Sequence, residues 1–600
     1  MNNIENTPRM KKSAIILRLL KYLTAHKGYI ALALLLTLTS NLLALIGPEL
    51  SGKAIDSISG IKNVDFDTVG KYTLLMIILY FLSAVLSFLL SVVMINLSRK
   101  VVYRMRRDVF NHLIDLPVGY FDSNQTGDLI SRLSYDIDTI NTSLSNDLIQ
   151  ICSGLITVIG CIIMMARISL PLMLVFFITV PTLIIFTKHR VIKVKPLFRA
   201  RSAKLGEMNG YAEEMLSGQK TIKAYGKEDV MTRRFDRCNY DASEAYYKAD
   251  YEGSVVGPSV NFINNLTLSL ICMLGAILLM IYSGDSIPKI LLPFSFTLGN
   301  LSSFILYSRR FVGPINEAAN IVSDIQSATS AAERVFRLLD ETPEPYGQIG
   351  MTDIEIKCDK LEMDDVSFSY VEGVRVLNDI SFSLEKGETL AIVGPTGSGK
   401  TSLVNLLMRF YDPDSGAIRI NGVNTMDATL ENTRSLFTMV LQETWLFGGT
   451  IAENIAYGNS SATLDDIIDA AKRARIHSFI ESLPNGYDTV ITDGGVNISK
   501  GQKQLITVAR AMLIDSPVLI LDEATSNVDS RTEANLQKAL SEIMKDKSSI
   551  IIAHRLSTIK NADKIIVLRS GRISEYGNHD SLLEKKGIYY SLYNSQFEGV

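Results

Sequence analysis

Long apolar runs recur in the first half of this 600-residue chain, and they constrain its fold more than any other feature. A helix needs about 20 mostly apolar residues to cross a bilayer. Residues 74–96 carry no charged side chain, whereas a buried helix of a large soluble protein would carry one every few positions. We therefore predict six membrane-spanning helices, with apolar cores at 29–50, 72–97, 148–166, 170–186, 260–282 and 287–307.

Lys and Arg residues indicate the orientation of these spans. They gather after the second and fourth spans, in 99–107 and 188–204, whereas the other connections are short or acidic. Because cytoplasmic loops carry the excess of basic residues, these two segments and both termini are expected in the cytoplasm. Both segments are too long for turns and are predicted to be helices that extend beyond the bilayer. Each is interrupted by a turn-rich piece, at 116–128 and 217–229, where we expect a cytoplasmic domain to dock.

Charge and cysteine content exclude other classes. The formal net charge of −3 gives no global basic surface for nucleic acid. The five cysteines are scattered, which disfavours a disulfide scaffold or a zinc site. Residues 1–27 interleave basic and apolar side chains without the uninterrupted core of a signal peptide, which predicts an amphipathic helix on the inner membrane surface.

The sequence pattern changes at the Pro- and Gly-containing stretch 342–347, which marks a domain boundary. Beyond it, short β-rich runs such as 388–394 and 518–522 alternate with helical stretches, as is typical of an α/β domain with a largely parallel sheet. We therefore expect an N-terminal surface helix (1–27), an all-α transmembrane domain (28–340), a linker (341–356) and an α/β P-loop domain (357–600).

Residues 394–401 match the phosphate-binding pattern G-x-x-x-x-G-K-[ST]. They follow a predicted strand at 390–393 and precede a predicted helix at 402–409, the context that a P-loop requires. Backbone N–H groups would close around the phosphates, and Lys400 would reach the β- and γ-oxygens. The predicted phosphate-binding residues are Gly394, Pro395, Thr396, Gly397, Ser398, Gly399, Lys400, Thr401 and Ser402.

Two carboxylates follow the apolar strand 518–521. Asp522 is predicted to help hold Mg²⁺, together with the Thr401 hydroxyl, and Glu523 to polarise the attacking water. This pair alone is also compatible with a solvated acidic turn, but it occurs in the same domain as the P-loop.

With these motifs in place, nearly the whole chain resembles the ATP-binding cassette (ABC) family. Residues 498–502, Ile-Ser-Lys-Gly-Gln, stand where the family has its L-S-G-G-Q signature. The resemblance implies ATP and Mg²⁺ as cofactors and catalytic roles for Lys400, Gln442, Glu523 and His554. It also implies an adenine-stacking role for Tyr370, a D-loop role for Asp529, a share of Mg²⁺ coordination for Gln442, and contact of Ser499, Lys500, Gly501 and Gln502 with ATP held by a partner.

Six spans fused to one cassette resemble an exporter half-transporter, which implies a second such chain as partner. The two turn-rich pieces then become coupling helices between cassettes and spans. Lys500 departs from the family pattern because it replaces the first signature glycine, while the residues of the catalytic set are retained. This combination resembles one subunit of heterodimeric exporters, with one altered ATP site. A homodimer in which Lys500 is tolerated, or a regulatory subunit that binds ATP without turnover, stays open.

The substrate is expected to be amphipathic: a drug, a lipid or a peptide, with multidrug or lipid export implied by the resemblance. A soluble cassette protein acting on ribosomes or DNA would lack the six spans. Lys- and Ile-rich usage suggests a bacterial cytoplasmic (inner) membrane, with its lipid as a further partner. Polar side chains within the spans either line a substrate path or join helices by hydrogen bonds: Asn41, Asn96, Asn261, Asn264, Asn265, Asn300 and Ser303.

Overall fold

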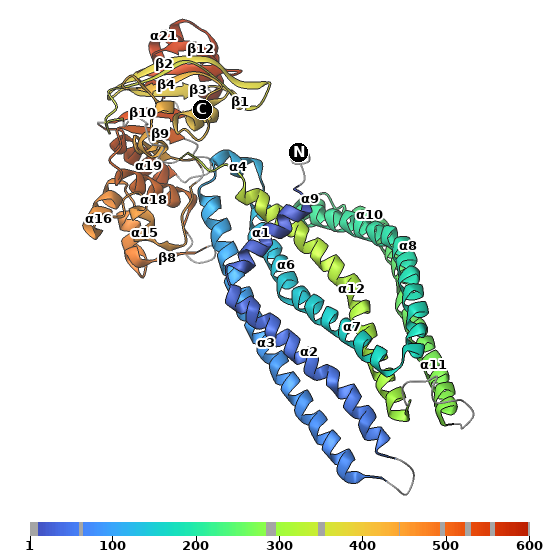
Figure 1. Ribbon diagram of the computed structural model, residues 1–600. Coiled ribbons are helices and arrows are strands. Elements are labelled where there is room, and N and C mark those ends of the chain that lie inside the picture. Colours follow the sequence, from blue (N-terminus) through green and yellow to red (C-terminus); the bar gives the residue numbers. More distant parts are fainter. Residues whose placement is uncertain are drawn as a thin grey trace. The chain divides into compact units, whose positions relative to one another are not determined.

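The structure, a computed structural model, describes residues 10–58, 64–283, 296–345, 354–442, 444–492, 498–522, 530–545, 547–552 and 559–597. The chain divides into two compact units (Figure 1). One comprises Met1–Leu113 and Gly127–Glu341 and is helical; the other comprises Ile114–Thr126 and Thr342–Val600 and contains the β-sheets. The predicted class, a helical membrane domain followed by an α/β P-loop domain, is confirmed.

The helical unit consists of long helices joined by short connections. Among the described residues, five helical stretches are long and apolar enough to cross a membrane: Lys27–Asp56, Phe66–Ile114, Thr126–Ile168, Leu170–Ser217 and Glu228–Ile281. The expected sixth span begins within 284–295, outside the described residues, and its remainder lies in α12. The helices are α1 Lys12–Thr24, α2 Lys27–Asp56, α3 Phe66–Ile114, α5 Thr126–Ser131, α6 Ile137–Thr142, α7 Leu148–Ile168, α8 Leu170–Ser217, α9 Gln219–Ala224, α10 Glu228–Ser254, α11 Val256–Ser283 and α12 Leu298–Leu339, with π-helical turns at Arg132–Asp136 and Ser143–Asp147.

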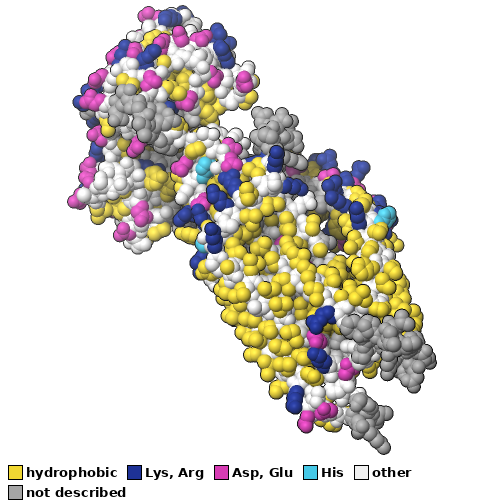
Figure 2. Space-filling view, in the orientation of Figure 1, with side chains coloured by type: hydrophobic (Ala, Val, Ile, Leu, Met, Phe, Trp, Pro, Cys, Tyr) yellow, Lys and Arg dark blue, Asp and Glu magenta, His cyan; other side chains and the backbone are white. Residues whose placement is uncertain are grey.

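Large apolar side chains cover the outer surface of these helices. On α3, Leu74 is 60% exposed and Phe81 is 71% exposed. Figure 2 shows apolar side chains along the flank of the helical unit, with Lys and Arg gathered towards its ends. Such a surface requires an apolar solvent, because water-exposed patches of this extent are rare in soluble monomers. The helical backbone satisfies its own polar groups, as a lipid environment requires.

Polar side chains join several of the spans. Asn41 of α2 accepts hydrogen bonds from Ser153 and Thr157 of α7, at 3.0 and 3.2 Å. Ser303 of α12 donates to the Pro48 carbonyl of α2 at 2.8 Å. For Asn41 and Ser303 the structure therefore favours helix–helix bonding, one of the two roles expected from the sequence.

The N-terminal helix α1 is held by one face. Ile15 and Leu19 are buried, and Arg18 Nη1 donates to both carboxylate oxygens of Asp340, beyond the end of α12, at 2.7 and 2.8 Å. The opposite face leaves Leu17 71% exposed. One face of α1 is therefore packed against the helical unit, and the opposite face exposes an apolar side chain.

The α/β unit is built on two main sheets. A six-stranded sheet has the order β12-β11-β3-β10-β9-β6 and is parallel except for the edge strand β12; a four-stranded antiparallel sheet has the order β2-β1-β4-β5, and β7 pairs with β8. The strands are β1 Lys360–Val371, β2 Val374–Glu385, β3 Thr389–Val393, β4 Ser415–Ile420, β5 Val423–Asn424, β6 Phe437–Val440, β7 Gly449–Thr450, β8 Val490–Ile491, β9 Val518–Asp522, β10 Ser548–Ile552, β11 Lys564–Arg569 and β12 Arg572–Gly577.

Helices cover the parallel sheet and complete its two cores. Alternate residues of β3 enter different cores: Leu390 and Ile392 join the core shared with the antiparallel sheet, whereas Ala391 and Val393 join the core under the helices. This burial on both faces explains the continuous apolar run of β3. The helices are α13 Lys400–Leu407, α14 Leu430–Ser435, α15 Ile451–Ala456, α16 Leu464–Arg473, α17 His477–Ser482, α18 Lys500–Met512, α19 Ser530–Ile543, α21 His579–Glu584 and α22 Ile588–Phe597, with 3-10 turns at Thr425–Asp427 and Gly486–Asp488.

The first turn-rich piece forms a short helix, α4 (Val118–Ser123), which groups with the α/β unit. Tyr411 donates a hydrogen bond to Asp122 of α4, and the Glu344 N–H donates to the Asp115 carbonyl at 2.7 Å. A Cβ at Gly119 would lie 2.9 Å from the Tyr411 ring, so glycine permits this approach. The expected docking at 116–128 is confirmed. The second piece forms α9, which groups with the helical unit.

Candidate nucleotide-binding site

Three parallel strands deliver the predicted ATP-site residues to one edge of the sheet. The P-loop follows β3, Asp522 ends β9, and Gln442 follows β6. Parallel pairing of β3 with β10, β10 with β9, and β9 with β6 places the carboxyl ends of these strands on the same side. Ligands of open α/β sheets bind at this edge, because the loops there diverge and leave a crevice.

The P-loop backbone depends on glycine. Gly394 has φ of 158° and packs so closely that a Cβ would collide with the Leu568 carbonyl of β11. Gly397 has φ of 80°, and a Cβ there would meet nothing within 4 Å, so its requirement is conformational and the space above it is free. The loop thus packs against β11 at its start and has open space at its middle.

Lys400 is the first residue of α13 and is buried. Its Nζ donates to the carbonyls of Gly394 and Pro395, at 2.8 and 3.1 Å. Burial lowers the pKa of Lys400, and the negative charge of Asp522 opposes that effect. Both loop carbonyls are weaker partners for an ammonium group than phosphate oxygens, so the geometry holds the loop in shape and leaves the cation ready for an anion.

The remaining groups of the loop fit a phosphate chain. Ser398 is buried, and its Oγ has no hydrogen-bond partner among the described residues. The first turn of α13 presents N–H groups without intrahelical partners, and the Thr401 side chain is exposed beside them. An unpartnered buried hydroxyl, free amides and a buried cation together match an anionic ligand.

Helix α13 begins two residues before the predicted start at 402 and ends before 409. Its early start places Lys400 and Thr401 in the first helical turn. Its end is set by Arg409, which has φ of 50° and donates to the carbonyls of Thr425 and Ala428. A left-handed residue stops the helix there.

Tyr370, at the end of β1, is joined to the P-loop helix. Its hydroxyl donates to Ser402 Oγ at 3.1 Å and accepts from Asn405 Nδ2 at 3.1 Å. The side chain is 43% exposed, which leaves a ring face available to a base. The structure therefore brings Tyr370 to the P-loop helix, as expected for a ring beside the adenine.

Two contributors to this site were not predicted from the sequence. Gly571, in the β11–β12 turn, donates its N–H to the Ser398 carbonyl and supports the loop from behind. Tyr411 packs edge-on to Tyr370, with 5.0 Å between ring centroids. The Ser-Gly pair at 570–571 indicates a turn, but no local pattern names its distant partner.

The signature segment caps α18. Ser499 accepts from the Gln502 N–H, while Gln502 Oε1 accepts from the Ser499 N–H at 2.9 Å. The helix starts at Lys500 because this capping box satisfies its first turn. Lys500 is exposed, and no carboxylate of the described residues lies within ion-pair distance. Among the described residues, no hydrogen bond joins 499–502 to the P-loop.

Three predicted site residues, Glu523, Asp529 and His554, lie outside the described residues. The described chain ends beside them on neighbouring strands, since Asp522 of β9 pairs with Ile552 of β10.

Long apolar helices and a P-loop domain with a capped signature helix define a membrane-embedded transporter that uses ATP. Comparison with known families agrees: residues 30–314 match the family model of the ABC transporter transmembrane region, and residues 377–526 match the family model described as ABC transporter. The chain belongs to the ABC transporter family. It is an ABC exporter with ATPase activity coupled to transport.

The matches to individual relatives cover most of this chain and most of each relative. The chain is 41% identical to a fatty acid ABC transporter ATP-binding/permease protein of Mycobacterium bovis, over 88% of this chain and 82% of that one. It is 35% identical to an ATP-dependent lipid A-core flippase of Vibrio parahaemolyticus, over 90% of both chains. A solved bacterial Atm1-family ABC exporter with ATP bound shares the fold, with a TM-score of 0.76, 27% identity, and coverage of 96% of this chain and 99% of that one.

Proposed function

We propose that this chain is one half of a dimeric exporter that moves lipid-like amphipaths across the bacterial cytoplasmic membrane, paired with a different half-transporter. The observation that carries this proposal is an apolar cavity of about 1110 Å³ in the helical unit. Relatives named for fatty acid and lipid A-core transport support the same substrate class.

Four helices line this cavity. Its walls are aliphatic, and a few polar groups stand among them. Asn261, one of the polar residues expected to line a substrate path, is among these groups. The lining residues include Gly154, Leu155 and Val158 of α7, Leu183, Ile184 and Lys188 of α8, Val260 and Asn261 of α11, and Pro314, Ile321 and Ile325 of α12. An apolar cavity with few polar groups suits an acyl chain rather than a polar solute.

At the nucleotide site, we assign a separate role to each predicted residue or segment. Tyr370 stacks on the adenine, residues 394–402 bind the phosphates through backbone N–H groups, and Lys400 donates to the terminal phosphates. Glu523 polarises the attacking water, and Gln442 and His554 share in catalysis. Thr401, Gln442 and Asp522 would hold Mg²⁺, which neutralises phosphate charge when bound. Few protein ligands are needed because Mg²⁺ is usually shared with phosphates and water.

The separation of the signature from the P-loop within this chain supports a dimer. The capped signature 499–502 makes no hydrogen bond to this chain's own described P-loop, so a second cassette is its natural target. Helix α9 groups with the helical unit and supplies a second coupling segment for a partner cassette. The exposed side chain of Lys500, where the family has glycine, supports an altered second ATP site and hence a heterodimer.

The test is to purify this chain alone in detergent and to measure its native mass and ATPase activity. We expect a monomer, or an inactive dimer that gains activity only with a second cassette chain. In that complex, Glu523→Gln should abolish turnover but keep ATP binding, whereas the exposed Glu584→Gln serves as a matched control and should change neither.

Other outcomes would select the alternatives. A dimer of this chain alone with Glu523-dependent turnover would establish the homodimer. ATPase activity that is unaffected by Glu523→Gln in the complex would show that this residue is not the base, as expected of a regulatory chain.

A further inference from the structure

The basic residues of α8 between 188 and 204 fall into two sets. Four of them are neutralised by carboxylates. The pairs are Arg190 with Glu252 (3.0 Å), Lys193 with Glu252 (2.9 Å), Arg201 with Asp250 (2.8 Å) and Lys204 with Glu207 (2.7 Å).

Lys188, Lys195 and Arg199 form the second set. No carboxylate of the described residues lies within 4.0 Å of their charged groups, and all three are exposed. Their spacing of seven and four residues places them on one helical face. Carboxylates of α10, together with Glu207 of α8 itself, therefore neutralise one face of α8 and leave the other face cationic.

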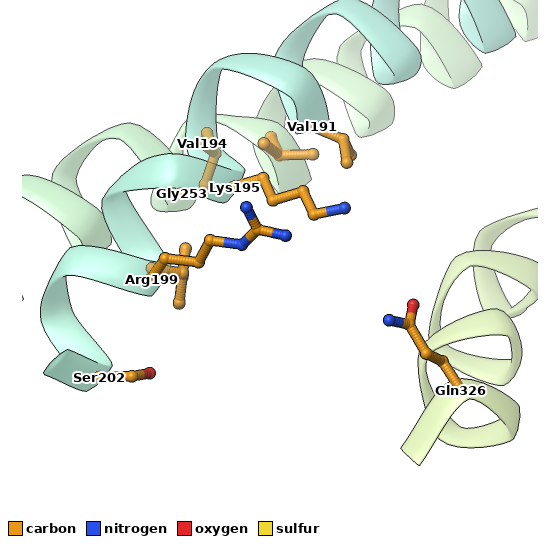
Figure 3. Close-up of a pocket in the computed structure, with 9 residues that line it drawn as sticks. Val191, Val194, Lys195, Arg199, Ser202, Gly253 and Gln326 are labelled. Atoms are coloured by element: carbon orange, nitrogen blue, oxygen red, sulfur yellow. The ribbon is translucent and has the colours of Figure 1, made fainter. Parts of the chain in front are cut away.

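This cationic face lines two adjoining cavities. Lys195 and Arg199 line a cavity of about 660 Å³, with Gln326 of α12 across from them (Figure 3). In Figure 3 both charged side chains extend from α8 into the space towards α12. Lys188 lines the larger apolar cavity, and Val191 and Val256 line both. The two cavities thus adjoin each other along α8.

The arrangement selects a ligand by charge as well as by apolar surface. Basic residues at the cytoplasmic end of spans are expected from topology alone, but topology does not explain why the carboxylates that pair with α8 all lie against its other face. A neutral ligand in the large cavity would leave Lys188, Lys195 and Arg199 without a counter-charge. A cationic ligand would be repelled by them. An anionic headgroup satisfies them.

We propose that Lys195 and Arg199, with Lys188 beside them, form a headgroup site for anionic amphipaths whose acyl chain occupies the larger cavity. The anion is a carboxylate or a phosphate. This inference rests on the proposed export of amphipaths and adds the charge of the substrate.

The experiment uses the assembled transporter in nanodiscs of zwitterionic lipid. Binding and ATPase stimulation are measured with four probes that share one chain: laurate, lauryl phosphate, lauryl alcohol and lauryltrimethylammonium. The test variant is Lys195→Gln/Arg199→Gln. The matched control, Lys193→Gln/Arg201→Gln, removes two charges from the paired face of the same helix, and Lys195→Arg/Arg199→Lys keeps the charge. ATP binding by each variant reports its folding.

The wild type should bind the two anions more tightly than lauryl alcohol by roughly three- to tenfold, the effect of two part-exposed charge pairs. The test variant should lose this preference while binding lauryl alcohol as before, and the other two variants should keep it. Laurate and lauryl phosphate separate carboxylate from phosphate selectivity.

Equal binding of charged and neutral probes by the wild type, or a preference that survives in the test variant, would overturn the headgroup site and leave amphipath export standing. If no probe binds or stimulates a transporter that binds ATP, the proposed function itself fails, and the headgroup site fails with it.

Discussion

Tyr411 donates a 2.6 Å hydrogen bond from its phenol to the carboxylate of Asp122 in α4. Burial raises the pKa of Tyr411 well above its usual value, and the hydrogen bond and charge of Asp122 raise it further, so the phenol keeps its proton. The same ring lies edge-on to Tyr370. Tyr411 therefore links α4 to Tyr370, the ring expected to stack on adenine.

Tyr411→Phe should weaken coupling while sparing catalysis. The variant keeps the ring packing against Tyr370 but loses the hydrogen bond to Asp122, worth about 1 kcal/mol. We expect ATPase activity within about twofold of wild type and a several-fold lower transport per ATP hydrolysed, since about 1 kcal/mol corresponds to a factor of about five. Vesicle uptake and ATPase assays measure both. Asp122→Ala, which removes the acceptor, should behave alike, and Tyr576→Phe, at an exposed position on β12, is the control. A parallel loss of both activities would indicate a purely structural bond.

Tyr370→Ala should weaken ATP binding. Loss of an aromatic platform for a base costs about 1 to 3 kcal/mol, so the dissociation constant should rise at least fivefold. Tyr370→Phe keeps the ring and removes only the contacts with Ser402 and Asn405, so its affinity should stay within about threefold of wild type. Equilibrium binding of a fluorescent ATP analogue distinguishes the variants. Equal affinity for Ala and wild type would exclude stacking on Tyr370.

Glu388→Gln should destabilise the cassette at neutral pH and not in acid. Burial alone would raise the pKa of Glu388, but the hydrogen bond from Lys564 at 2.6 Å and the N–H of Glu385 lower it below the usual value. A lowered folded-state pKa gives stability that is present above the unfolded value of about 4.3 and is lost as pH falls through the folded value.

The expected loss for this variant is about 1 kcal/mol at pH 7, shrinking below about pH 4. Thermal unfolding can be followed through Trp445, which is the chain's single tryptophan and belongs to the cassette. Glu584→Gln is the control for loss of an exposed charge. A stability difference that persists unchanged in acid would contradict the ion pair as its source.

Lys500→Gly should raise ATP turnover in the heterodimer, if the exposed Lys500 side chain holds the signature away from the opposing phosphate. Removing a cation from the first turn of α18 should also stabilise that helix by about 0.3 to 1 kcal/mol, offset by the helix propensity of glycine. Turnover of the complex is the measurement, and Lys503→Gly is the control in the same turn region. A fall in turnover would show instead that Lys500 attracts the phosphate.

Local sequence determined the periodic and short-range features of this protein. Apolar runs gave the spans, and the P-loop context gave its strand and helix, because a helix, a strand end or a glycine-rich turn depends on neighbouring residues. The exact helix ends depend on local contacts: α18 starts at Lys500 because Ser499 and Gln502 cap each other, and α13 ends at Leu407, shortly before the left-handed residue Arg409.

Only the tertiary structure decided which distant groups meet. Sequence alone left open whether the polar residues of the spans line a path, and packing joined Asn41 to α7 and placed Asn261 at the cavity. It also divided the basic residues of α8 into a neutralised face and a cationic face. Such contacts arise when apolar burial brings helices and strands together, and no pattern in a single segment encodes which partner a side chain will find.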